Sequence, residues 1–272
     1  MPITKAEKAA YNDYIKEYQA ELESLKKIDK EIAIKKRKMA AIAPYYNIES
    51  VFVHLKITSL YIKMSDASLE MLNIKNESFL NNARKEIYKI IQMLEETVGN
   101  DIDRTLKENE EYLIKIEKIN PKQILNLIIS IQKIVDIIIQ RMGEKSKWKW
   151  SFVDIQGRIA VIAKNFINFS DVEKARDPRK EYYRERHDLL KICKRSLNEA
   201  AKQYRTRYEI SAQIPADILK AIELLAALRK INILFRESTE AAKLKNTIEA
   251  LHARLEADES QENDKKKKII RQ

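Results

Sequence analysis

The sequence predicts an all-α fold, and three observations lead to that prediction. Glycine occurs only three times in 272 residues, whereas an average soluble protein contains about 7% glycine. Glycine supplies the positive-φ turns of β-hairpins and phosphate-binding loops, so this chain has few means of building them. No alternating apolar stretch bounded by turn residues indicates a strand. Apolar residues recur instead at helical spacing, often at every seventh position.

The first predicted segment, residues 1–43, is one long helix with a coiled-coil pattern. Thr4 and Glu7 have the spacing of a capping box, and Pro44 is expected to end the helix. A narrow stripe of this kind gains little stability alone and therefore needs a partner helix. Along the stripe every seventh residue is apolar, and these residues are Tyr11, Tyr18, Leu25, Ile32 and Met39.

Residues 44–170 are expected to form a compact multi-helix core. Residues 121–142 form its central member, because they are apolar over most of the helix circumference and carry polar residues on one thin stripe. Gly99 and Gly143 are expected to end helices, and Gly157 to permit a close approach inside one. The helices are expected at 48–74, 77–98, 101–119, 121–142 and 152–169.

Residues 171–257 are expected to form a long helical hairpin. One helix follows Pro178 and ends near Ile210, and the last helix runs from Ile214 to about Ala257. Residues 258–272 are too polar to pack and predict a disordered charged tail. The complete prediction is an elongated bundle with a compact core and long heptad-patterned coiled-coil helices at both ends of the chain. In the last helix the seam residues include Leu234, Ile248, Leu251 and Leu255.

The composition also limits the class of function. The chain has a net charge of +11 and one cysteine, Cys193, which excludes an internal disulfide. Its start lacks the pattern of a signal peptide, and its most apolar stretch is interrupted by polar residues, so we expect a cytoplasmic protein without a transmembrane segment. Glu249 and His252 have the Glu-x-x-His spacing of a metal ligand pair, but only one such motif is present. We therefore expect no catalytic residues, no metal and no cofactor, and hence not an enzyme.

The function that these features favour is a scaffold or assembly protein that binds protein partners, or further copies of itself, through coiled-coil faces. Large aromatic rings and aliphatic side chains are the usual anchors of such interfaces. The sequence leaves open whether the seams close within one chain or between chains. The predicted protein-binding residues are Tyr11, Tyr18, Leu25, Ile32, Trp148, Trp150, Leu234, Ile248, Leu251 and Leu255.

Two basic features support an alternative function, sequence-tolerant binding of nucleic acid. A basic stripe on the helix 178–208 has the length to follow a phosphate backbone, although nearby acidic residues also fit an ordinary solvated face. The lysines that alternate with Trp148 and Trp150 suit a negatively charged partner, or the two rings cap the bundle. The cations of residues 35–38 lie in the last turns of the first helix, where they complement the helix dipole. We do not expect the protein to contact a membrane surface. The stripe consists of Lys180, Arg184, Lys191, Lys194 and Arg205.

Overall fold

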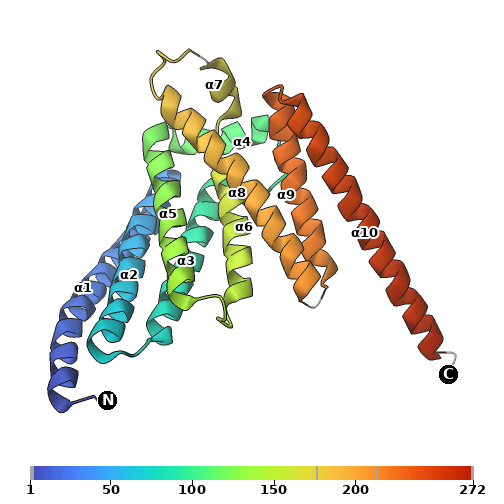
Figure 1. Ribbon diagram of the computed structural model, residues 1–272. Coiled ribbons are helices and arrows are strands. Elements are labelled where there is room, and N and C mark those ends of the chain that lie inside the picture. The colour runs from blue at the N-terminus through green and yellow to red at the C-terminus, as the bar shows by residue number, and fades with distance from the viewer. Residues whose placement is uncertain (1–2, 176, 212, 271–272) are drawn as a thin grey trace. The chain divides into compact units, whose positions relative to one another are not determined.

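The computed structural model describes residues 3–175, 177–211 and 213–270, with side chains described as far as Ser260. Within these residues the chain forms ten α-helices, two short 3₁₀ helices and no strand (Figure 1), which confirms the all-α prediction. Two compact units are present: Met1–Asn100 with Leu106–Ile155, and Asp101–Thr105 with Gln156–Gln272. The sequence placed a boundary after residue 170, whereas the two units divide within one continuous helix, α6.

The first unit begins with three long helices in which α1 packs on α2 and α2 packs on α3. The predicted capping box is present, because the Thr4 hydroxyl accepts from the Glu7 N–H and the Glu7 carboxylate accepts from the Thr4 N–H. The role expected of Pro44 is wrong. It lies in the first turn of α2, where a missing N–H costs no hydrogen bond. These elements are α1 (Lys5–Lys38), η1 (Ala40–Ile42), α2 (Ala43–Leu72) and α3 (Glu77–Val98).

The rest of the first unit is built around α5. Asn120 and Gln123 cap its start reciprocally, and Gly143 ends it at a φ of 79°. By length and composition alone α5 could cross a membrane, but it packs on α2 and α3. Its predicted polar stripe is exposed, as in the core helix of a bundle: Lys122, Asn126, Ser130, Lys133, Asp136 and Gln140. The further elements are α4 (Leu106–Leu113), η2 (Ile114–Ile116), α5 (Pro121–Met142) and the start of α6 (Lys149–Asn165).

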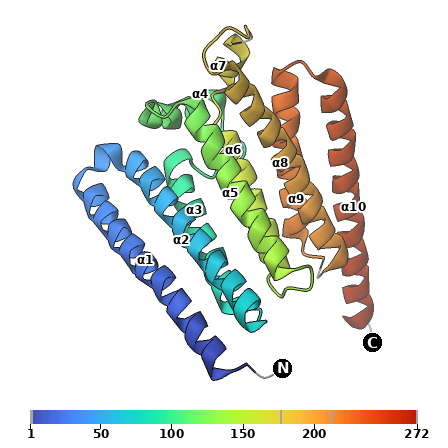
Figure 2. The same ribbon diagram turned by 60° about the vertical axis from the view of Figure 1, so that its left-hand side comes forward.

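In the second unit α9 is the central helix, with α8 and α10 packed on it (Figure 2). The sequence predicted one helix from residue 214 to 257, and this prediction is wrong. The chain turns between α9 and α10, where Arg236 has a φ of 62° and the Glu237 N–H donates to the Asn232 carbonyl at 2.8 Å. The elements are α7 (Phe169–Lys174), α8 (Tyr183–Ile210), α9 (Pro215–Leu234) and α10 (Ser238–Ile270).

The predicted tail, residues 258–272, begins inside α10. Its backbone is helical as far as Ile270, although the sequence favoured a disordered segment. The side chains of residues 261–272 and the backbone of the last two residues lie outside the described part of the chain.

The few glycines have the roles that the sequence predicted. Gly99, with a φ of 75°, and Gly143 end helices α3 and α5. Gly157 permits a close approach of α6 and α8, because a Cβ atom added there would lie 2.6 Å from Cε2 of Tyr204. Other helix boundaries use non-glycine residues at positive φ, namely Asn73, Tyr182, Gln213 and Arg236.

Candidate protein-binding faces

The heptad seam of α1 is covered within the chain as far as Ile32, whereas Met39, its last predicted residue, is exposed. Leu25 and Ile32 are buried in a cluster with Ile57 and Leu60 of α2. Tyr11 and Tyr18 lie at the edge of the same cluster and are partly buried. The apolar surface that the sequence assigned to a partner therefore stabilises the packing of α1 on α2.

The seam predicted near the end of the chain is also largely covered. Leu251 and Leu255 are buried, whereas Leu234 and Ile248 are half-buried. Leu234 is the last residue of α9, so it does not share a helix with the other three. The seam thus packs inside the second unit, mainly against α9.

Both tryptophans lie where α5 is joined to α6, and both are half-buried. The guanidinium carbon of Arg84 lies 4.0 Å from the centre of the Trp148 ring. Lys149 lies over the Trp150 ring at 5.2 Å. Arg84 is buried and is held by Asn81, whose Oδ1 accepts from Nη2 at 2.9 Å. The Trp148 ring therefore contacts a cation of its own chain, which favours the interpretation that the two tryptophan rings cap the bundle.

The basic stripe is interrupted and partly neutralised. Lys180 precedes α8, because that helix begins at Tyr183 and not at Pro178. Lys194 Nζ lies 2.6 Å from Glu237, and Arg205 Nε lies 2.8 Å from Glu209. Lys191 Nζ lies 3.6 Å from Asp188. Among the residues that the structure describes, Lys180 and Arg184 form no ion pair. The positive field along α8 is correspondingly weakened.

Three exposed aliphatic residues lie near the junction of α8 and α9, and the sequence pattern did not indicate them. Ile210 is 62% exposed and Ile214 is 51% exposed, and Leu219 on the first turns of α9 is also exposed. We name these three residues the α8–α9 tip. The two isoleucines stand at predicted helix ends, where heptad analysis assigns no packing role, and only their closeness in sequence signals a patch.

A largely buried ion pair joins α8 to α9 next to the α8–α9 tip. Arg207 Nε donates to Asp217 Oδ2 at 2.9 Å, and a second guanidinium N–H donates to the other carboxylate oxygen. Asp217 is buried, and such bidentate pairs hold both groups in one orientation. A pocket of about 170 Å³ adjoins the tip. It is lined by Arg205, Tyr208, Glu209, Ile218, Thr247, Ala250, Leu251 and Arg254.

A second feature missed from the sequence is a buried polar cluster that joins α1, α2 and α3. His54 Nδ1 lies 2.5 Å from Glu86 Oε2, and His54 Nε2 lies 3.3 Å from Asp29 Oδ2. Lys89 donates to the other oxygen of Glu86 at 2.9 Å. Burial raises the pKa of Glu86, but the hydrogen bonds from His54 and Lys89 outweigh burial and hold it below its ordinary value. The cluster is a hydrogen-bonded polar network that includes the Lys89–Glu86 ion pair.

No group of three or more His, Cys, Asp or Glu side chains in the described part of the chain could hold a metal ion. Comparison with protein families gives a match that spans residues 7–259, which includes most of both compact units. No curated protein and no solved structure matches the sequence significantly.

Proposed function

The chain belongs to the TP0443 family, whose model matches residues 7–259, and we propose that it is a non-enzymatic helical scaffold or assembly protein that binds a partner protein. The observation that carries this proposal is the exposed α8–α9 tip. Exposed groups of large aliphatic side chains often mark interaction sites. Contact of their apolar surface with water is unfavourable, and a bound partner removes that contact.

The tip has two further properties of a protein-binding site. The Arg207–Asp217 pair joins the end of α8 to the start of α9, so the helices that carry the tip residues are already ordered before a partner binds. The adjoining pocket combines apolar walls from Ile218 and Leu251 with the polar groups of Tyr208 and Thr247. Such a pocket suits one anchoring side chain of a partner.

The heptad seams contribute to the proposal in a different way from what the sequence favoured. Their buried residues, such as Ile32 and Leu255, are covered by helices of the same unit. We therefore assign the seams to the internal assembly of each unit. Binding between chains is assigned to the tip.

The test compares the α8–α9 tip with a matched residue of α9. Ile210→Asp combined with Ile214→Asp is expected to abolish self-association in light scattering and capture of partner proteins. Ile233→Asp is the control, because Ile233 is 53% exposed in the same unit and lies at the other end of α9. Equal capture and equal molar mass for both variants would refute the assignment, as would a wild-type monomer that captures nothing.

The nucleic-acid alternative is tested separately on α8. Arg184→Glu with Lys191→Glu changes two exposed cations. If the stripe binds duplex DNA near physiological ionic strength, about 0.15 M, this variant loses that binding. Wild-type protein without affinity for duplex DNA or heparin eliminates the alternative. We expect no binding of nucleic acid, because Lys194 and Arg205 are already neutralised by ion pairs with Glu237 and Glu209.

A further inference from the structure

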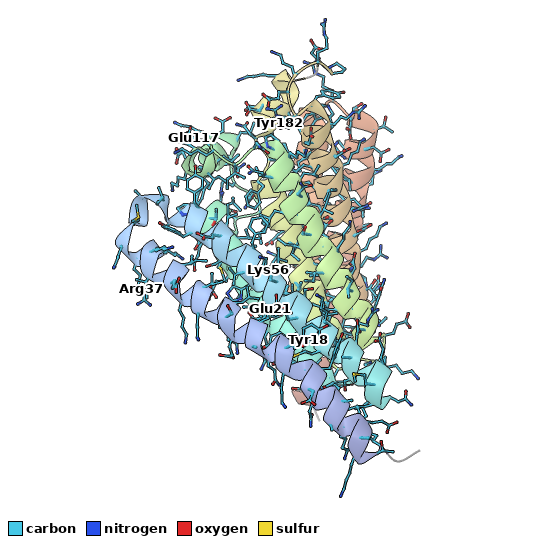
Figure 3. The ribbon with its side chains drawn as sticks, turned by 90° about the vertical axis from the view of Figure 1, so that its left-hand side faces the viewer. Tyr18, Glu21, Arg37, Lys56, Glu117 and Tyr182 are labelled. Atoms are coloured by element: carbon cyan, nitrogen blue, oxygen red, sulfur yellow. The ribbon has the colours of Figure 1, made fainter. Side chains whose placement is uncertain are left out.

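A basic face lies on the side of α1 that points away from α2. Lys27, Lys30, Ile34 and Lys38 follow one another at spacings of three and four residues, so they form one stripe along the helix. The buried Ile32 lies on the opposite side. Figure 3 shows Arg37 near the end of α1 where the chain turns into α2. It follows Ile34 by three residues, so it extends this stripe. We name it the α1 basic face.

The cations of the α1 basic face are exposed and form no ion pair within the described residues. Their neighbours differ, since Lys26 pairs with Glu23 at 2.8 Å and Lys36 pairs with Glu96 at 2.7 Å. The Asp29 carboxylate contacts His54 of α2, so it does not lie beside the cations of the α1 basic face. Glu31 is the one carboxylate between residues 27 and 38 that remains on the outer side. The face therefore keeps a net positive charge.

Exposed aliphatic side chains accompany these cations at the corner between α1 and α2. Ile34 is 52% exposed, Met39 is 51% exposed and Ile42 is also exposed. The Tyr46 hydroxyl donates to Met39 Sδ at 3.3 Å, which positions that side chain. Met39 directly precedes the short η1 helix and Ile42 is its last residue, so both lie at the turn between α1 and α2.

We propose that the α1 basic face and its aliphatic corner bind the surface of an anionic membrane. A helix with cations on one face and aliphatic side chains beside them suits the boundary between lipid headgroups and acyl chains. A nucleic acid would instead be met by cations together with stacking rings, and no aromatic residue lies between Lys27 and Ile42. This inference departs from the expectation, drawn from the sequence, that the cations of residues 35–38 serve only the helix dipole.

The test measures co-sedimentation of the full chain with vesicles of phosphatidylcholine and phosphatidylserine in a two-to-one ratio, and with vesicles of phosphatidylcholine alone. Wild-type protein is expected to bind the first and not the second, and added salt is expected to weaken binding. The variant Lys30→Glu, Arg37→Glu, Lys38→Glu should lower the partition coefficient at least about tenfold. The control variant Lys180→Glu, Arg184→Glu, Lys191→Glu carries the same change of net charge on α8 and should bind like wild type.

A second variant tests the aliphatic corner without changing charge. Met39→Ser with Ile42→Ser should reduce binding to the anionic vesicles, and it decides the question if the charge-reversal variant fails to fold by circular dichroism. The proposal is overturned if wild-type protein does not bind the anionic vesicles. It is also overturned if the α1 and α8 variants lose vesicle binding equally. Binding of the wild-type protein to duplex DNA but not to vesicles, with the DNA binding lost in the α1 variant, would assign the face to nucleic acid and also overturn the proposal.

Discussion

The contact of Gly157 with Tyr204 gives a prediction in which two opposing effects have known sizes. In Gly157→Ala the new Cβ would lie 2.6 Å from Cε2 and 2.9 Å from the hydroxyl oxygen of Tyr204. The ring cannot move away easily, because Tyr204 is buried and the Arg207 guanidinium lies 4.9 Å from its centre. Alanine in a helix interior gains about 1 kcal/mol over glycine, whereas overpacking of a filled core costs about 1–3 kcal/mol. We expect a net loss of about 1 kcal/mol.

The assay is urea unfolding followed by circular dichroism, performed as a double-mutant cycle. In a Tyr204→Ala background the clash is absent, so Gly157→Ala should stabilise the protein by up to about 1 kcal/mol. The sign of the substitution is thus expected to reverse between the two backgrounds. Effects that agree within about 0.5 kcal/mol in both backgrounds would refute the reasoning, because they would show that the two residues do not interact.

Three further predictions concern groups that are buried and polar. The lowered pKa of Glu86 means that its stabilising effect is complete above the unfolded value of about 4.3 and is lost as the pH falls through the folded value. Glu86→Gln should therefore flatten the acid side of the stability profile in thermal melts, and an unchanged slope would contradict this. Asp217→Ala removes the carboxylate that pairs with the partly buried Arg207 guanidinium and should cost about 1.5–3 kcal/mol in urea unfolding. A cost that persists when Arg207→Met is added would count against the ion pair as the cause. Burial raises the pKa of Cys193 to about 12, so a thiol reagent should label it only after denaturation, and rapid labelling of the native protein would disprove its burial.

Local signals in the sequence located several helices well. The predicted ranges 77–98 and 121–142 agree with α3 and α5, because Asn120, Gly99 and Gly143 act on the backbone next to them. The break between α9 and α10 has no such signal, since it contains neither glycine nor proline. It depends on packing of α10 against α9, which one sequence does not reveal.

The candidate sites show the same division between local and long-range information. The seven-residue spacing of Leu25 and Ile32 indicated an apolar face, but not that α2 would cover it. Asp29 interrupts that spacing and so looks like a defect in the sequence. In the structure it faces His54, a residue of the next helix. Contacts between distant residues of this kind follow from the fold and leave no periodic trace.

The turn at Arg236 makes the junction between α9 and α10 a site where proteases are expected to act. Arg236 is exposed and has left-handed backbone geometry, which for a residue with a Cβ atom costs about 1–2 kcal/mol. Its side chain is also the kind that trypsin recognises. Local opening and cleavage concentrate at such exposed, strained connections. Brief digestion with trypsin should therefore cut at Arg236 and separate the α10 segment from the α8–α9 hairpin.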